Sequence, residues 1–141
     1  MTGTMEDGGM CDVDDQPNAT PLIVVLDDDR AIVEGLSLLL DSWGFEVVTA
    51  LSLAALEQSL STLTRPPSLI IADHYLPAGR TGAEAVERLR GFAGKPVPAI
   101  ILTGDTTPER QEEAQALGCM LLHKPVQVAP LRAAVELLTR G

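Results

Sequence analysis

Residues 22–44 read LIVVLDDDRAIVEGLSLLLDSWG and contain one apolar run followed by one amphipathic stretch. The first five residues are all apolar, which is typical of a central parallel strand covered on both faces. After the three aspartates, apolar residues recur every three or four positions and predict a helix that ends near Trp43 and Gly44. Glycine adopts the left-handed conformation that closes many helices. This stretch therefore predicts one β-α unit.

The same alternation continues to the end of the chain. The further apolar runs are Phe45–Thr49, Ser68–Ala72, Val97–Leu102 and Cys119–Leu122. The helices between and after them are expected to begin at the cap Ser52, to span Ala83–Leu89 before Gly91, to run from the cap Thr107 to Gly118, and to span Pro130–Thr139. The run FEVVT is the most mixed and is expected at or near a sheet edge. The pattern predicts a doubly wound α/β domain with a five-stranded parallel sheet.

The first 20 residues differ from the rest in composition. They contain five acidic residues, no lysine or arginine, and few residues that could be buried. We therefore expect residues 1–20 to be a disordered acidic tail or linker, and residues 21–141 to form the domain.

Charge and composition exclude several classes of function. The formal net charge is -10, so no basic surface is expected for nucleic acid or anionic lipid. The two cysteines, Cys11 and Cys119, are too few for a disulfide framework or a zinc site. No apolar run approaches the roughly 18–20 residues of a membrane span, and the N-terminus does not resemble a signal peptide. We expect a cytoplasmic module that contacts neither nucleic acid nor membrane.

Polar residues follow four of the five predicted strands. They are Asp27-Asp28-Asp29 after the first strand, Asp73 after the third, Thr103 after the fourth and His123-Lys124-Pro125 after the fifth. The carboxyl ends of parallel strands lie at one edge of the sheet, where ligands bind in such folds. Asp29 precedes the first helix and is expected to be only its N-cap. The other groups are expected to share one cleft.

The chemistry of this cleft points to phosphoryl transfer. Asp27, Asp28 and Asp73 cannot all stay ionised at close range unless a cation joins them, and an oxygen-rich, water-accessible site suits Mg²⁺. Lys124 supplies a compact positive charge and Thr103 a hydroxyl donor for phosphoryl oxygens. Asp73 is then the carboxylate that is free to act as a nucleophile.

Four segments resemble, in order, the signature segments of the response-regulator receiver domain of two-component systems. They are VVLDDDRAIVEGL at 24–36, LIIADHYLPAGRTG at 69–82, AIILTGD at 99–105 and LLHKPV at 121–126. The resemblance covers roughly residues 21–140 and implies a flavodoxin-like (βα)5 fold with strand order 2-1-3-4-5. Within the family, DHYLP and LLHKPV are most similar to the receivers of hybrid sensor histidine kinases.

The resemblance also implies a role for each site residue. These roles are phosphoacceptor for Asp73, Mg²⁺ ligands for Asp27, Asp28, Asp73 and the backbone carbonyl of Tyr75, switch hydroxyl for Thr103, and phosphate contact for Lys124, whose peptide bond to Pro125 should be cis. One position departs from the family pattern. Leu121 stands where many members have Tyr or Phe, which leaves open how the switch works here.

The implied function is a phosphorylation-controlled signalling module. It would accept a phosphoryl group from the phosphohistidine of a histidine kinase or phosphotransfer protein and would catalyse only its own phosphorylation and dephosphorylation. A downstream protein would bind the face formed by the fourth helix, the fifth strand and the fifth helix.

Two other functions use related folds. An aspartyl-phosphatase-type hydrolase needs a second aspartate two residues after the nucleophile, where this chain has Tyr75. A flavin-binding module needs a loop rich in Ser, Thr and Gly after the first strand, where this chain has three aspartates. Both are less favoured than the signalling module.

Overall fold

The structure is a computed structural model that describes residues 20–63 and 65–140. The predicted tail, residues 1–20, lies outside the described residues apart from Thr20. The strands are β1 Leu22–Leu26, β2 Glu46–Ala50, β3 Leu69–Asp73, β4 Tyr75–Leu76, β5 Arg80–Thr81, β6 Ala99–Thr103 and β7 Cys119–His123. The α-helices are α1 Arg30–Ser42, α2 Leu53–Ser59, α3 Gly82–Ala93, α4 Pro108–Ala116 and α5 Val128–Arg140, and the 3-10 helices are η1 Leu60–Thr62 and η2 Pro77–Gly79.

The predicted main sheet is confirmed. Its five strands are parallel and lie in the order β2-β1-β3-β6-β7, which is the predicted order 2-1-3-4-5 because β6 and β7 are its fourth and fifth strands. The mixed strand β2 lies at an edge, as its composition predicted. Every residue of β1 and β6 is buried, because helices cover both faces of the sheet.

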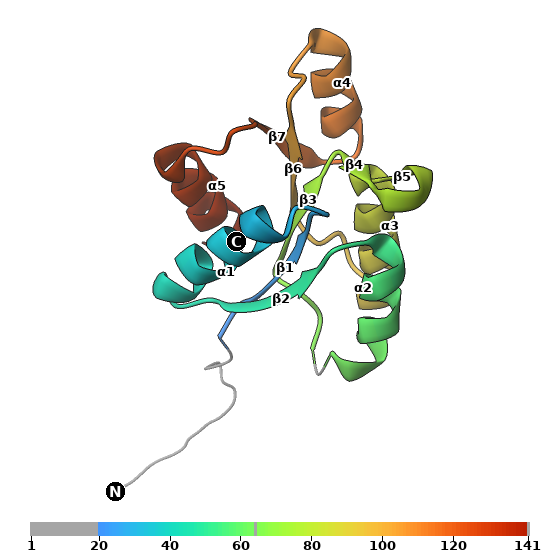
Figure 1. Cartoon of the computed structure of the whole chain (residues 1–141), viewed down its shortest axis with the longest axis vertical. Coiled ribbons are helices and arrows are strands. Elements are labelled where there is room, and N and C mark those ends of the chain that lie inside the picture. The colour runs from blue at the N-terminus through green and yellow to red at the C-terminus, as the bar shows by residue number, and fades with distance from the viewer. Residues whose placement is uncertain (1–19, 64, 141) are drawn as a thin grey trace, which may run out of the picture.

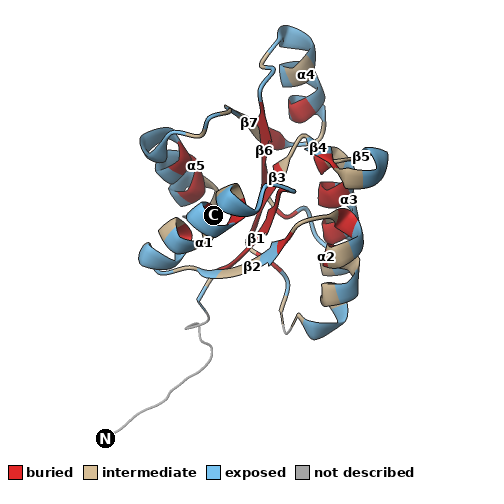
Figure 2. Ribbon diagram, in the orientation of Figure 1, coloured by how far each residue is buried: buried red, intermediate tan, exposed pale blue. Residues whose placement is uncertain are grey.

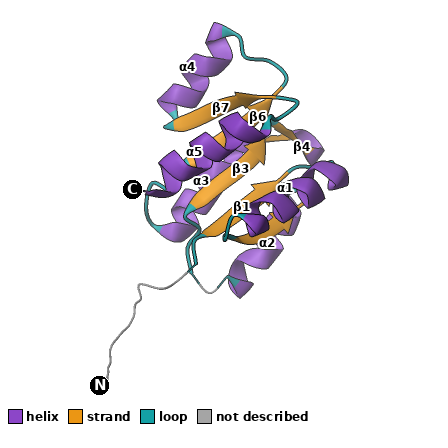
Figure 3. Ribbon diagram, turned by 90° about the vertical axis from the view of Figure 1, so that its left-hand side faces the viewer, coloured by secondary structure: helices purple, strands orange, loops and turns teal. Residues whose placement is uncertain are grey.

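Helices lie on both faces of the sheet (Figure 1, Figure 3). Along β1, Ile23 and Val25 pack in the core beneath α1 and α5, whereas Val24 and Leu26 pack in the core beneath α2 and α3. Successive side chains of a strand point to opposite faces, so one apolar run supplies both cores. The strands at the centre of the molecule are accordingly the most buried part of the chain (Figure 2).

Helix α4 is the least covered of the helices in the layer that contains α2 and α3. Ala114 is its only buried residue, and the rest of the helix is half-buried or exposed (Figure 2). None of the helices in the described part of the chain combines the length and the apolar character needed to cross a membrane.

The predicted caps of three helices are confirmed. The side chain of Asp29 accepts hydrogen bonds from the backbone N–H groups of Ala31 and Ile32 at the start of α1. Ser52 caps α2 and Thr107 caps α4 in the same way. Gly44 has a φ of 91° directly after the end of α1, so the glycine stop is also confirmed.

The predicted bounds of the third helix were wrong. We expected Ala83–Leu89 with a stop at Gly91, but α3 spans Gly82–Ala93 and closes at Gly94, whose φ is 71°. Thr81 and Glu84 form a capping box that starts the helix, and the packing of Leu89 carries it past the exposed Gly91. Similarly, α5 begins at Val128, two residues before the predicted Pro130, because proline is tolerated in a first helical turn.

A small hairpin after β3 was not predicted. Tyr75 pairs with Thr81 and Leu76 with Arg80, around the short turn η2. The hairpin returns the chain so that the Gly82 N–H donates to the His74 carbonyl at 3.0 Å. A Cβ at position 82 would collide with the Asp73 carbonyl. Only glycine lets the start of α3 approach the end of β3 this closely.

This close approach predicts opposite effects for two glycines of the same helix. Gly82→Ala should lower the free energy of unfolding by about 1–3 kcal/mol, because the added methyl meets backbone at the end of β3. Gly91→Ala, where no atom lies within 4 Å, should raise it by roughly 0.5–1 kcal/mol. Urea unfolding followed by circular dichroism measures both; equal effects of the two substitutions would contradict the packing argument.

Candidate functional site

Three predicted aspartates meet at the carboxyl edge of the sheet. Asp27 and Asp28 follow β1, and Asp73 is the last residue of β3. One carboxylate oxygen from each lies within 4.8 Å of the others. The pairing of Leu26 with Ala72 sets this arrangement, because it brings the ends of β1 and β3 level. Asp27 is buried, Asp73 is half-buried and Asp28 is exposed, so the cluster opens to solvent on one side.

Lys124 joins two of these carboxylates. Its Nζ lies 3.3 Å from Asp27 Oδ2 and 3.1 Å from Asp73 Oδ1. The exposed fractions are 26% for the Lys124 side chain, 1% for Asp27 and 13% for Asp73, so these ion pairs are largely shielded from water. The Lys124 N–H also donates to the Thr103 carbonyl at 2.7 Å, and the Lys124–Pro125 peptide bond is cis, as the resemblance implied.

Burial and charge shift the pKa values of these groups. Burial raises the pKa of Asp27, assisted by the charge of Asp73 and opposed by a hydrogen bond from the Asp29 N–H and by Lys124. Burial alone would lower the pKa of Lys124, but its hydrogen bond to Asp73 and the negative charges of Asp27 and Asp73 raise it. Lys124 therefore keeps its positive charge, whereas burial destabilises the ionised form of Asp27.

Thr103 is the last residue of β6 and is buried at the same edge. Its hydroxyl oxygen accepts a hydrogen bond of 3.0 Å from the Asp105 N–H. The Asp105 carboxylate in turn accepts from the Thr107 N–H at 3.0 Å. The hydroxyl is thus tied to the loop that leads into α4.

Tyr75 and His74 follow Asp73 on the hairpin. The Tyr75 side chain is 63% exposed, and its ring meets the His74 ring edge-on with centroids 4.3 Å apart. Burial, followed by the nearby charge of Arg110, lowers the pKa of His74. His74 therefore lies at the rim of the site, next to the hairpin.

Arg110 of α4 makes a contact outside the acidic cluster that the sequence did not predict. Its guanidinium donates to the Tyr75 hydroxyl at 2.9 Å, across 35 positions of the chain. The capping signal at Thr107 predicted the helix that carries Arg110, but no local pattern indicates a partner so distant in sequence. The hairpin that positions Tyr75 was also missed.

The residues present fit a magnesium ion. Mg²⁺ binds oxygen ligands at about 2.0–2.1 Å. One carboxylate oxygen from each of Asp27, Asp28 and Asp73 lies within 4.8 Å of the others, so small adjustments would let them bind one ion, which would relieve their mutual repulsion. An all-oxygen set of carboxylates also suits Mg²⁺ better than zinc, which favours nitrogen and sulfur ligands.

A doubly wound sheet with three aspartates and a lysine at one edge defines a class of α/β signalling modules. The sequence profile described as "Response regulator receiver domain" matches residues 23–136, and the chain belongs to this family. It is a receiver domain of two-component signalling, a kind of module that interacts with histidine kinases or phosphotransfer proteins.

Individual relatives agree with this assignment. The chain is 33% identical over 115 residues to the transcriptional regulatory protein FixJ of Bradyrhizobium diazoefficiens. The aligned residues make up 81% of this chain and 54% of that protein. The chain therefore spans about half the length of the curated relative. Among solved structures, it resembles the chemotaxis response regulator CheY4 of Vibrio cholerae, with a TM-score of 0.72, 26% identity and coverage of 85% and 99% of the two chains. A receiver domain protein from Clostridium thermocellum gives a TM-score of 0.74, 25% identity and coverage of 85% and 94%.

The raised pKa of Asp27 predicts how an amide at this position affects stability. A raised folded-state pKa means that the contribution of Asp27 to stability is full below the unfolded-state pKa and is lost as pH rises through the folded-state pKa. In metal-free buffer at pH 7, Asp27→Asn should therefore be more stable than the unchanged chain, by on the order of 1 kcal/mol.

The difference should shrink as the pH falls toward about 4 and vanish below about 3, where the Asp27 carboxyl is protonated in both the folded and the unfolded state. Urea unfolding at several pH values in the presence of a chelator measures it. The result to the contrary is that the stability of Asp27→Asn relative to the unchanged chain is lower at pH 7 than at pH 4. It would show that the Lys124 ion pair outweighs the cost of burying the Asp27 carboxylate.

Proposed function

We propose that Asp73 accepts a phosphoryl group from a phosphohistidine of a histidine kinase or phosphotransfer protein. The observation that carries the proposal is the position of the Asp73 carboxylate, which is partly open to solvent, 3.1 Å from the Lys124 ammonium and beside two further carboxylates. An Asp73 oxygen would bond to phosphorus as the P–N bond of the donor breaks, and the released imidazole would take up a proton.

The other site residues support this transfer through charge and position. Lys124 offsets the negative charge that otherwise repels a phosphoryl group from Asp73, and it remains to bind the phosphoryl oxygens afterwards. Asp27, Asp28, Asp73 and the backbone carbonyl of Tyr75 would hold Mg²⁺. When bound, that ion supplies further neutralisation of the phosphoryl oxygens.

Thr103 is the proposed switch residue. Its hydroxyl would donate to a phosphoryl oxygen on Asp73, and the Asp105 N–H that now bonds to this hydroxyl belongs to the loop before α4. A movement of Thr103 would therefore be felt at the start of α4. This chain would catalyse only its own phosphorylation and dephosphorylation.

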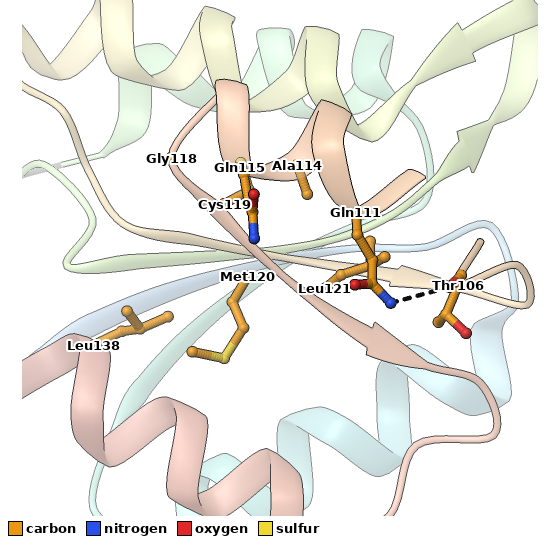
Figure 4. Close-up of a pocket in the computed structure, with 9 residues that line it drawn as sticks. All are labelled: Thr106, Gln111, Ala114, Gln115, Gly118, Cys119, Met120, Leu121 and Leu138. Carbon is orange, nitrogen blue, oxygen red and sulfur yellow. Dashed lines mark hydrogen bonds between the residues drawn. The ribbon is translucent and has the colours of Figure 1, made fainter. Parts of the chain in front are cut away.

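A downstream partner would bind the face made by α4, β7 and α5. Between α4 and α5 this face carries a groove of about 530 Å³, crossed by Cys119, Met120 and Leu121 (Figure 4). The groove supports the proposal because it exposes apolar side chains next to the helix that Thr103 adjoins. The absence of nucleic-acid contact and the cytoplasmic location stay predictions from composition.

The source of the receiver, from a hybrid histidine kinase, also stays a prediction. The curated relatives that the chain matches are named transcriptional regulatory proteins. The aspartyl-phosphatase and flavin alternatives are not favoured. Tyr75 stands where the former needs a second aspartate, and three aspartates stand where the latter needs a loop rich in Ser, Thr and Gly.

Incubation with acetyl phosphate and Mg²⁺, read by intact mass, tests the proposal. The unchanged chain should gain one phosphoryl group, and Asp73→Asn should gain none, because an amide oxygen is a far weaker nucleophile than a carboxylate. Removing Mg²⁺ with a chelator should also abolish the gain.

Asp29→Asn is the matched control. It makes the same chemical change two residues after Asp27, and asparagine caps a helix as well as aspartate does, so the mass gain should persist. Equal gains in Asp73→Asn and the unchanged chain, or no gain in any of the three chains, would overturn the proposal.

A further inference from the structure

Arg110 contacts three groups that otherwise belong to separate parts of the molecule. One nitrogen of its guanidinium donates to the Tyr75 hydroxyl at 2.9 Å, and the other terminal nitrogen donates to Glu113 Oε1 at 3.0 Å. Its Nε lies 3.8 Å from Asp105 Oδ2. The centre of the guanidinium is 6.0 Å from the Tyr75 ring centroid. Arg110 thus connects the hairpin after Asp73 with α4 and with the loop after Thr103.

The Arg110 contacts lie in an environment that favours a defined geometry. The side chain is 27% exposed, and its Nε is buried without a hydrogen-bond partner in the described part of the chain. A planar guanidinium holds its donors in a rigid fork, which fixes the directions of these bonds more firmly than the rotatable ammonium of a lysine would. Asp105 Oδ2, at 3.8 Å, lies outside hydrogen-bond distance of Nε, so a shift of the loop that shortened this distance would give Nε a partner.

The contact is also continuous with the proposed switch. The Asp105 N–H bonds to the Thr103 hydroxyl, and its carboxylate faces Arg110. Tyr75 is two residues beyond the proposed phosphoacceptor, on a hairpin that begins directly after β3. Any displacement of Thr103 toward Asp73 acts on one side of Arg110, and any displacement of the hairpin acts on the other.

The side chains between α4, β7 and α5 offer a weaker route for transmitting a change at the site to α4. Leu121 is half-buried and lies along the groove with Leu138 and Met120, and all the side chains lining it are aliphatic, polar or sulfur-containing (Figure 4). It therefore presents no aromatic ring whose rotation could report the state of the site.

We propose that Arg110 is a positioning residue that ties α4 to Tyr75, so that phosphorylation of Asp73 moves α4 through this contact. The inference rests on the proposed function, because it assumes that Asp73 is the residue modified. In this proposal, the Tyr75–Arg110 pair at the outer surface of the molecule couples the Asp73 site to α4.

Nuclear magnetic resonance can read the two ends of this contact separately. Tyr75 is the sole tyrosine of the chain, so ring labelling of tyrosine gives one signal that belongs to it. The backbone amides of α4 report the position of the helix. The full chain is compared before and after acetyl phosphate and Mg²⁺, with the phosphorylated fraction taken from the intact mass.

Arg110→Met should shift the Tyr75 ring signal before any phosphodonor is added. After phosphorylation, the amide shifts of α4 per phosphorylated molecule should fall at least about twofold relative to the unchanged chain. Tyr75→Phe, which removes only the hydroxyl, should reduce the same α4 shifts. The extent of phosphorylation of Arg110→Met should match that of the unchanged chain, because Arg110 touches neither Asp73 nor Lys124.

Arg132→Met is the matched control. Arg132 also pairs with a glutamate on its own helix, Glu136 at 3.2 Å, and also faces an aromatic ring, Trp43 at 5.2 Å, but it lies on α5. It should leave the Tyr75 signal and the α4 shifts unchanged. The inference alone would be overturned if phosphorylated Arg110→Met showed α4 amide shifts as large as those of the unchanged chain. It would also be overturned if Arg132→Met reduced these shifts as much as Arg110→Met does. An unchanged chain that gains no phosphoryl group would overturn the proposed function, and the inference with it.

Discussion

The Lys124 ammonium lies between two carboxylates that come from positions 97 and 51 residues away, and the edge of the sheet is organised around this contact. Asp27 and Asp73 would repel each other in a place where water is largely excluded, so a cation has to join them. That cation reaches them only if β7 ends level with β6, and β3 with β1. The strand register, fixed by apolar residues packed on both faces, is therefore what makes the acidic cluster possible.

Lys124 does not satisfy the cluster completely. It neutralises one of three nearby negative charges, and burial still raises the pKa of Asp27. A second cation is therefore favoured, and a phosphoryl group that arrives with one meets both charges. Without a ligand, the carboxylates of the site repel one another, and the binding of a cation and a phosphoryl group can relieve this repulsion. Functional sites commonly keep such local costs, which the surrounding core has to offset. Here the offset comes from the fully buried strands β1 and β6.

Much of this could be predicted from the sequence, because the deciding patterns are local. The strands appear as apolar runs, the caps as Asp29, Ser52 and Thr107, and the site residues at the positions where strands end. The errors arose where distant packing overrides a local signal. Gly91 indicates a helix stop, yet α3 continues to Ala93, which is partly buried and packs against the core. The hairpin at Tyr75 has strands of two residues, too short to show any periodicity.

Arg110 shows the same limit at the level of function. Its contact with Tyr75 depends on where the hairpin and α4 come to lie, and neither residue type indicates the other in sequence. The contact bears on how a receiver without an aromatic residue at position 121 transmits phosphorylation to α4. Helix α4 is anchored to the core mainly through Ala114, so few contacts oppose its movement. A helix held so lightly is easily biased by one geometrically demanding contact at its exposed first turns, and Arg110, bonded to the residue two positions past Asp73, makes that contact.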